Sequence, residues 1–525
     1  YAYDGEGHLR YTVSAEGRVT EFRYSDTGLL EFAIEYPEQT YTTAYVEGIA
    51  LTEASMNAWR DAIADRQSTK ITYYTYDTRG NQYFLLNYGY APTAGAAPTA
   101  EGYSRVYTTY DSAGRLINRN AEGRSQEYWT YDSLGRVTGF TNTAGGSTSI
   151  TFNDGALQTT ISTSTGSTTT QTYNKAGDLV SETVSGSFDP TATSTFKSDK
   201  LGRVRMATDA AGGNTYYIYD KAGRLVGEVD HFGGLTEYRY DAANRVIATA
   251  RYFNALSAAT LTTLADPNNT FELTAATRPS THAYDVFTWT VYDAAGRVVQ
   301  SIDGSGAVQA FEYDQSNRLI KTTSYATKLD ISSYKVTPPL TAVTVTAATA
   351  DTVSRTFYNS DGKLIGALDG EGYLTEVVYD KAGQKTDEIA YSTKTNSAYW
   401  ASGTFAQLRT SAGSAARRVR FVYDGQGLLR YRVDTAGQVT GYTYGNQAGQ
   451  LTATRVYANT ISPADYTYDA VKAAATTSAS DRVTTLTYNA SGTVATSTDP
   501  ANLVTTFAYD GFGRVTKVQV GSGTS

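Results

Sequence analysis

A short motif that contains tyrosine returns through the whole sequence at a fixed interval. The stretch "YDKAGRLVGEVDHFGGLTEYRYDAANRV" (219–246) holds Tyr-Asp-x-x-Gly-Arg-Leu and, 21 residues later, Tyr-Asp-x-x-Asn-Arg-Val. The motif tyrosine stands at positions 3, 24, 76, 110, 131, 173, 219, 240, 292, 313, 358, 379, 423, 444, 488 and 509, and degenerate copies at Phe152 and Ser198 bring the total to about eighteen units. A chain of 525 residues exceeds one ordinary core of roughly 100–200 residues, whereas repeated units pack only on their neighbours. The sequence therefore predicts a repeat array.

Each unit predicts two short strands joined by tight turns. In the unit that begins at Tyr219, the strands are expected at 224–230 and 235–240, and the turns at 231–234 and 241–244. Glycine or asparagine at the fourth motif position suits a residue with positive φ, and the aspartate suits an Asx-turn. The 44 Tyr and 47 Gly agree with half-exposed strands and frequent turns. The expected fold class is all-β, with antiparallel hairpins in series.

Strand twist decides the shape of such a ribbon. Adjacent strands rotate by about 20–25°, so a sheet of this width must curl, split or coil. We expect a wide spiral ribbon wound around a central space. The periodicity leaves open whether that space is filled or is the interior of a hollow shell.

Alternation along the second strand predicts an aromatic face, because side chains two residues apart share a face. The position two before the motif tyrosine is mostly aromatic, at Phe22, Tyr74, Trp129, Tyr217, Tyr238, Phe311, Phe421, Tyr442 and Phe507. The residue between them is often polar, as at Arg23, Thr75, Thr130, Arg239, Glu312 and Thr443. We expect the aromatic positions to pack as a ladder, and the stacking of exposed rings on glycans stays open as an alternative.

Longer intervals between motifs predict insertions in a single array that spans 1–525 and is interpreted as a segment of a longer protein. The insertions are expected at about 31–70, 86–103, 251–283, 326–352, 392–416 and 456–480. Three of them predict short helices, at 51–66 with Thr52 as N-cap and Met56, Trp59 and Ile63 on one face, at 254–266, and at 397–412. We expect these excursions at equivalent strand ends, where they cover one rim of the ribbon.

Composition excludes several function classes. The net charge of −8 argues against a nucleic-acid partner, which would need a basic face. No apolar run approaches the roughly 18–20 residues of a membrane span. The absence of cysteine excludes disulfides, thiol catalysis and zinc–thiolate sites, and no cofactor is expected.

The few candidate chemical groups favour structural roles. His8, His231 and His282 are the only histidines, and none has a second histidine nearby in the sequence. The acidic turns at Asp4–Glu6, Asp303 and Asp369–Glu371 lack the alternating ligands and distal glutamate of a calcium loop. Arg417, Arg418 and Arg420 are expected at a solvated strand entry, and the motif arginines are expected to pair with acids on neighbouring hairpins. We expect no catalytic site, and therefore no enzyme.

The repeat resembles the YD repeats of bacterial Rhs proteins, of Tc-toxin BC components and of teneurins. The residues that carry the resemblance are Tyr110, Asp111, Gly114, Arg115, Tyr131, Asp132, Gly135, Arg136, Tyr219, Asp220, Gly223, Arg224, Tyr240, Asp241, Asn244, Arg245, Tyr292, Asp293, Gly296, Arg297, Tyr313, Asp314, Asn317, Arg318, Tyr509, Asp510, Gly513 and Arg514. The resemblance implies a β-ribbon that spirals into a hollow shell around a C-terminal toxin domain. Toxin-bearing members add an aspartyl self-cleavage segment, whereas Asp499-Pro500 is followed here by the ordinary repeat.

Two functions remain in view. The first is a non-enzymatic, secreted or cell-surface shell, of bacterial origin, that encloses or displays a polypeptide cargo such as a toxin. The second is an extracellular adhesive or filament-forming protein, because open strand edges can pair with neighbouring copies of the same repeat. Neither function involves nucleic acid, and glycan binding belongs to the second.

Overall fold

The computed structural model describes residues 1–41, 51–63, 69–88, 104–186, 190–381, 383–424, 427–445, 449–489, 491–510 and 513–522. It holds 36 strands in one sheet and a few short helices. The strands are β1 (Ala2–Tyr3), β2 (Leu9–Val13), β3 (Arg18–Tyr24), β4 (Leu30–Thr40), β5 (Lys70–Tyr76), β6 (Gln82–Tyr88), β7 (Ser104–Tyr110), β8 (Leu116–Ala121), β9 (Glu127–Tyr131), β10 (Val137–Asn142), β11 (Ser147–Asn153), β12 (Gln158–Thr163), β13 (Thr168–Tyr173), β14 (Leu179–Ser185), β15 (Ala192–Ser198), β16 (Val204–Thr208), β17 (Asn214–Tyr219), β18 (Leu225–Val229), β19 (Leu235–Tyr240), β20 (Val246–Arg251), β21 (Val286–Tyr292), β22 (Val298–Asp303), β23 (Val308–Tyr313), β24 (Leu319–Tyr325), β25 (Thr352–Tyr358), β26 (Leu364–Leu368), β27 (Leu374–Tyr379), β28 (Lys385–Tyr391), β29 (Ala415–Tyr423), β30 (Leu429–Val433), β31 (Gln438–Tyr444), β32 (Leu451–Thr460), β33 (Arg482–Tyr488), β34 (Val494–Thr498), β35 (Leu503–Tyr509) and β36 (Val515–Ser522). The helices are α1 (Glu53–Asp61), α2 (Ala258–Leu264), the 3-10 turn η1 (Ser397–Tyr399), α3 (Phe405–Ser411) and α4 (Tyr468–Ala474).

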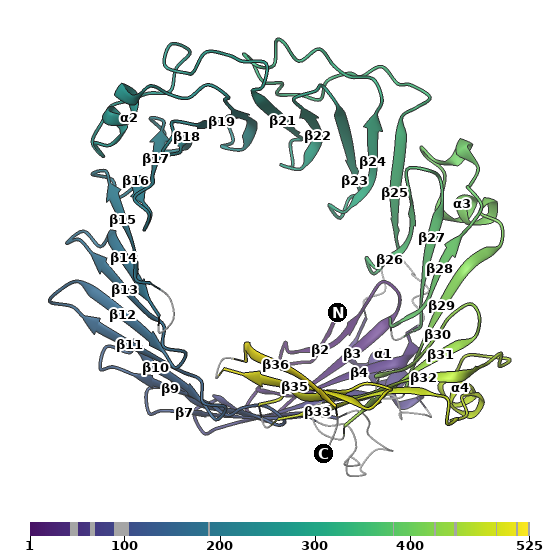
Figure 1. Cartoon of the computed structure of the whole chain (residues 1–525). Coiled ribbons are helices and arrows are strands. Elements are labelled where there is room, and N and C mark those ends of the chain that lie inside the picture. The colour runs from purple at the N-terminus through teal and green to yellow at the C-terminus, as the bar shows by residue number, and fades with distance from the viewer. Residues whose placement is uncertain are drawn as a thin grey trace.

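Every strand pairs antiparallel with the strand that follows it in the sequence, from β1–β2 through to β35–β36. The sheet is therefore one long meander, and Figure 1 shows it wound into a ring whose late strands return to the early ones. The predicted all-β spiral of serial hairpins is confirmed.

The meander gives the ribbon two different rims. Each turn from an odd to an even strand holds a copy of the tyrosine motif, such as 111–114 or 220–223, and these turns form what we call the YD rim. Each turn from an even to an odd strand lies at the opposite edge, which we call the second rim, as at 209–212 and 230–233. The motif tyrosine marks a shift in strand register at the YD rim, as between Ile218 and Tyr219.

The insertions all leave from the second rim, between an even and an odd strand. The predicted helix at 51–66 is confirmed over 53–61, with Thr52 as its N-cap and Met56 buried, while 64–68 lie outside the described residues. The other two predicted helices are shorter than expected, as α2 and α3. The expected insertion at 86–103 lies mostly outside the described residues, since β6 ends at Tyr88 and β7 begins at Ser104.

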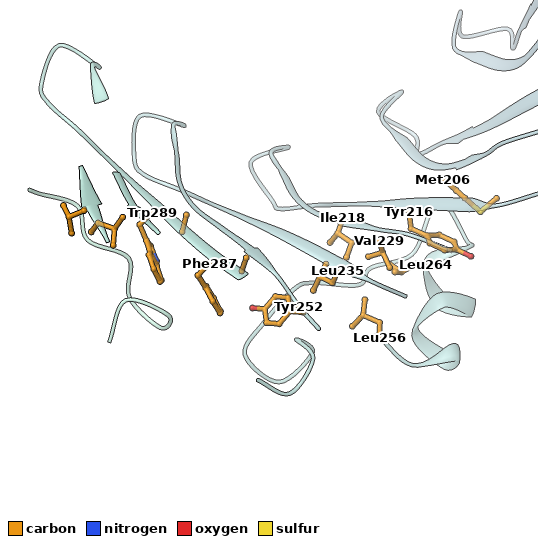
Figure 2. Packing of buried hydrophobic residues seen from close by; sticks show 14 residues of the cluster. Met206, Tyr216, Ile218, Val229, Leu235, Tyr252, Leu256, Leu264, Phe287 and Trp289 are labelled. Carbon is orange, nitrogen blue, oxygen red and sulfur yellow. The ribbon is translucent and has the colours of Figure 1, made fainter. Parts of the chain in front are cut away.

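The buried cores lie beneath these insertions. Figure 1 places α2, α3 and α4 on the outer side of the ring, and Figure 2 shows Ile218, Val229 and Leu235 pointing from the sheet toward Leu256 and Leu264 of the α2 insertion. Three similar clusters include a buried residue from α1, α3 or α4. The deepest apolar packing is therefore on the outer face.

This result corrects the prediction that the aromatic positions form the apolar face. In β17, Tyr216 and Ile218 are buried beneath the insertion, so the alternate residues Tyr217 and Tyr219 lie on the inner face and are only half-buried. The sequence pattern of a single strand could not reveal this burial, because the covering residues come from insertions distant in sequence.

The ribbon passes its own beginning after a full circuit. The backbone N–H of Glu16, in a second-rim turn, donates to a carboxylate oxygen of Asp361 in a YD-rim turn, 345 residues further on. Gly492 and Gly123 lie in a second contact of this kind. They are so close that a Cβ added to Gly492 would lie 2.6 Å from the Gly123 carbonyl oxygen. The second rim of the first circuit thus meets the YD rim of the second circuit, and we call this contact the seam.

Candidate functional site

Complete copies of the tyrosine motif close the YD-rim turn with their own aspartate and arginine. In the copy at Tyr110, one Asp111 carboxylate oxygen accepts the backbone N–H groups of Ala113 and Arg115, both at 2.9 Å, and the other accepts Arg115 Nε at 2.7 Å. Gly114 has a φ of +79°, which glycine adopts without strain. Donation from the Arg115 backbone and guanidinium holds the pKa of Asp111 below its usual value.

The same motif also grips the next hairpin. The Arg115 guanidinium lies 4.7 Å from the centre of the Tyr131 ring and donates to the Asp132 carbonyl oxygen. The Tyr131 hydroxyl in turn donates to the Leu116 carbonyl oxygen at 2.7 Å. A complete motif therefore joins two successive hairpins through a stacked cation and a hydrogen bond, an arrangement that we call the YD clip.

The motif positions named from the sequence lie in this arrangement around the ring. The aspartate–arginine pairs are Asp111–Arg115, Asp132–Arg136, Asp220–Arg224, Asp241–Arg245, Asp293–Arg297, Asp314–Arg318 and Asp510–Arg514. The arginine stacks on the next motif tyrosine in the pairs Arg203–Tyr219, Arg224–Tyr240, Arg245–Tyr292, Arg297–Tyr313 and Arg318–Tyr358. The fourth motif position has a positive φ at Gly114, Gly135, Gly223, Asn244, Gly296, Asn317 and Gly513.

The expectation that motif arginines pair with acids on neighbouring hairpins was wrong for most copies. The acid partner is the aspartate four residues earlier in the same turn, because the bulged turn brings both side chains to one edge. The neighbouring hairpin supplies a carbonyl oxygen and an aromatic ring instead. Arg136 does both, since it also contacts Asp154 at 2.9 Å.

A second recurrent cluster fixes insertions to the outer face. Glu237 lies three residues before a motif tyrosine and is buried, and it accepts the Tyr252 hydroxyl at 2.7 Å. Arg278 of the insertion donates to the same carboxylate at 2.5 Å, and Arg239 of the same strand donates at 3.1 Å. This glutamate, tyrosine and insertion arginine form what we call an anchor.

The anchor recurs in two other units that carry insertions. Glu21 accepts from Tyr36 at 2.5 Å and from Arg60 of α1 at 3.0 Å. Glu376 accepts from Tyr391 at 2.6 Å and from Arg409 of α3 at 3.0 Å. Sequence reasoning missed the anchors, although their spacing is constant, with the tyrosine 15 residues after the glutamate in each case.

Burial and charge act in opposite directions on the pKa of the Glu237 carboxylate. Burial would raise the pKa of Glu237, but hydrogen bonds from Arg278, Arg239 and Tyr252 hold this pKa below its usual value. Burial and the neighbouring carboxylate raise the pKa of Tyr252 to about 12. At neutral pH the anchor therefore combines a charged glutamate with a neutral tyrosine, as an ion-paired structural lock rather than a proton-transfer pair.

Each of the three histidines contacts local side chains. His8 contacts Asp4 at 3.3 Å and stacks on Tyr24. His231 lies against Phe232, and His282 stacks on the exposed Phe253 with ring centroids 4.3 Å apart. The residues that the structure describes contain no group of three or more acidic or histidine side chains suited to a metal ion.

The acidic turns and the arginine cluster take up structural roles. Asp303 and Asp369 each accept two backbone N–H groups of their own turns, as an Asx-turn does. Arg418 pairs with Asp387 on the adjacent strand at 2.6 Å. Asp499 likewise caps its own turn, so the Asp-Pro sequence is part of an ordinary repeat.

Comparisons with known proteins agree with this architecture. The Teneurin YD-shell family model matches residues 38–249, and the RHS Repeat model matches residues 292–327 and 488–525. A crystal structure of TcdB2-TccC3-TEV matches with a TM-score of 0.50 at 15% identity, over 99% of this chain and 22% of that chain. A structure of the Photorhabdus luminescens Tc holotoxin pore matches with a TM-score of 0.48 at 15% identity, over the same shares. No curated protein sequence matches the chain.

The matched residues identify the repeats of this chain as Rhs and YD repeats, and its fold is the spiral of β-hairpins that the YD-shell model describes. The chain spans about a fifth, 22%, of the length of the two solved chains named above. Among the described residues, no helix has the length and apolar character needed to cross a membrane.

Proposed function

We propose that the chain forms part of the wall of a non-enzymatic YD-repeat shell that encloses a polypeptide cargo, such as a C-terminal toxin domain. The observation that carries this proposal is the seam, because a ribbon that returns to bond with its own first circuit makes a continuous wall instead of an open strip. Clips and anchors engage a recurring set of the charged residues of the wall, such as Arg224 and Glu237, which supports a structural role for them.

The size of the ring supports an enclosing role. The turn between β2 and β3 meets the turn between β25 and β26, so about 23 strands make one circuit. At about 4.8 Å per strand the perimeter is at least about 110 Å and the backbone diameter about 35 Å, and strand tilt enlarges both. A folded domain of 100 residues has a radius of gyration of about 13 Å and is roughly 34 Å across, so a ring of this size takes an extended chain segment, and takes such a domain only where strand tilt widens it.

Toxin assemblies among the solved structures support a secreted or cell-surface location, with a polypeptide as the partner. A net charge of −8 does not favour a nucleic-acid cargo. The secreted or cell-surface location and the polypeptide partner are therefore part of the proposal.

Protease protection in the natural full-length protein tests the proposal. We expect a segment outside the repeats to resist proteolysis in the intact particle and to be cut after the wall is unfolded, and electron cryo-microscopy should show polypeptide density inside the ring. A ring without such density, in which every segment outside the repeats is cut at once, would contradict enclosure. Filaments that lengthen with protein concentration would favour the adhesive alternative.

A further inference from the structure

The second-rim turn at 14–17 lacks the aspartate or asparagine that closes most turns of this rim, and the opposite side of the seam supplies a carboxylate in its place. In the turns at Asn142, Asp209, Asp230, Asp303, Asp369, Asp434 and Asp499, a side-chain oxygen accepts the backbone N–H groups two and four residues later. The turn at 14–17 begins with Ser14, whose hydroxyl oxygen accepts only the later of these, from Arg18 at 3.1 Å. The earlier N–H, that of Glu16, donates to Asp361 at 2.9 Å.

Asp361 is also displaced within its own turn. The YD-rim turn at 359–362 carries asparagine at the aspartate position, and its aspartate stands two residues later. Asn359 still accepts the Lys363 backbone N–H, so this turn closes without Asp361. The Asp361 carboxylate is therefore free to act across the seam, where its side chain is only 8% exposed.

The contact across the seam is reciprocal. Besides Glu16 N–H, Asp361 accepts the Ser14 hydroxyl at 3.2 Å and the Arg18 guanidinium. In return, the Glu16 carboxylate accepts the Ser360 backbone N–H at 3.1 Å. Arg18 also donates to the Lys381 carbonyl oxygen in the next YD-rim turn of the second circuit.

We propose that Ser14 and Asp361 form a register latch, in which one carboxylate shared across the seam determines where the second circuit docks on the first. A second-rim turn with its own aspartate closes without outside help and would place a second negative charge against Asp361. The turn at 14–17 is instead incomplete alone, and a YD-rim turn with an acid at its third position fits it. The latch concerns closure of the wall and holds whether or not a cargo is enclosed.

Moving the carboxylate by mutation from position 361 to position 14 tests the latch. The 525 residues contain no cysteine, so Thr27→Cys and Glu371→Cys place two spin labels on exposed turns of the first and second circuits, at the rims away from the seam. Two strand lengths separate them, roughly 40 Å, which pulsed electron paramagnetic resonance can measure. With the native Ser14 and Asp361 in place, the two labels should give one narrow distance distribution.

We expect Asp361→Asn, and separately Ser14→Asp, to broaden and lengthen this distribution. The Glu16 and Ser360 amides should exchange hydrogen roughly tenfold to hundredfold faster, because hydrogen bonds to a charged group are lost or opposed by repulsion. The double variant Ser14→Asp with Asp361→Asn retains one carboxylate at the seam, and it should restore the native distribution. Thr163→Asp is the matched control, since Thr163 opens another second-rim turn without an aspartate and bonds within its own turn.

Unchanged distances and amide exchange in Asp361→Asn would overturn the latch. A double variant as open as the single variants would overturn it too, provided that exchange in the distant Ile218 cluster shows an intact sheet. Opening caused by Thr163→Asp would show that any new charge on the second rim loosens the wall, which also contradicts a specific latch.

Discussion

Two stretches of the same ribbon differ sharply in how they are packed. From β7 to β15 the described residues form hairpins without a helix and include no buried hydrophobic side chain, and the strands are rich in threonine. From β16 to β23 the outer face carries the α2 insertion and a large buried cluster that includes Ile218 and Trp289. Both stretches contain YD clips, as at Arg115–Tyr131 and Arg224–Tyr240, although the copies at Phe152 and Tyr173 of the plain stretch lack the motif arginine. A clip thus joins hairpins with or without a core beside it, and insertions add a conventional core where they are present.

The largest difference between the stretches should appear at their tryptophans. Trp289 is 0% exposed beneath the insertion, whereas Trp129 is half-buried on the plain ribbon beside Phe140. We expect Trp289→Ala to lower the local free energy of unfolding by about 3–5 kcal/mol, and Trp129→Ala to lower it by about 1–2 kcal/mol. Regional hydrogen exchange measures both, and equal losses would remove the distinction between the stretches.

Removal of the negative charge from an anchor should have the second-largest effect on stability. Glu237→Gln weakens the bonds from Arg278 and Tyr252 in a buried site, and we expect a loss of about 3 kcal/mol that is confined to the α2 insertion. Glu182→Gln on the plain ribbon, where Glu182 accepts from Gln171, should cost less than about 1 kcal/mol. Proteolysis of the insertion at equal rates in both variants would argue against the anchor.

Acid should affect the same anchor. The pKa of Glu237 is lower in the folded protein than its ordinary value of 4.5, so its stabilising contribution is complete above pH 4.5 and is lost as the pH falls through the lower folded value. We expect amide protection of the insertion to fall below pH 4.5 in the native protein. In Glu237→Gln this step should be smaller, and an identical pH profile would count against the assignment.

Two glycines with nearly the same backbone conformation separate turn geometry from packing. Gly212 and Gly233 have φ values of +85° and +89°, but only Gly233 lies against the insertion, where an added Cβ would be 2.8 Å from the Leu256 carbonyl oxygen. We expect Gly212→Ala to cost about 1–2 kcal/mol through φ strain, and Gly233→Ala to cost more because backbone must also move. Denaturation followed by regional exchange should rank them in that order, and the reverse ranking would contradict the packing.

The smallest effect should be the same in both stretches. Tyr131→Phe and Tyr240→Phe each remove one clip hydrogen bond, to Leu116 and Leu225, and we expect each to cost about 0.5–1.5 kcal/mol. A clearly larger loss of unfolding free energy for Tyr240→Phe than for Tyr131→Phe would show that the clip stabilises the ribbon only beside a buried core.

Local chemistry explains which features could be predicted from the sequence. The 21-residue spacing, turn residues such as Gly114 and the Thr52 cap of α1 act within a few residues of their partners, and they predicted the strands, the turns and one helix. By contrast, the anchor joins Glu237 to Arg278, which is 41 positions away. The seam joins Glu16 to Asp361, which is 345 positions away. No single unit encodes such pairs, so the buried outer face could not be assigned from one strand.

Some of the missed site was nevertheless present as a pattern. Glutamate three positions before a motif tyrosine, followed 15 residues later by another tyrosine, occurs at Glu21, Glu237 and Glu376 in units with insertions. A comparison among the units, instead of a search within each, would have revealed it. The displaced Asp361 is a similar exception to the repeat, visible only against the other copies.

Electron cryo-microscopy of the protein tests the central claim most directly. The account predicts a single sheet with strands in sequence order, wound into a ring in which the turn at 14–17 contacts the turn at 359–362 and Gly123 lies beside Gly492. A map of separately packed globules, or of an extended ribbon whose circuits never meet, would contradict it.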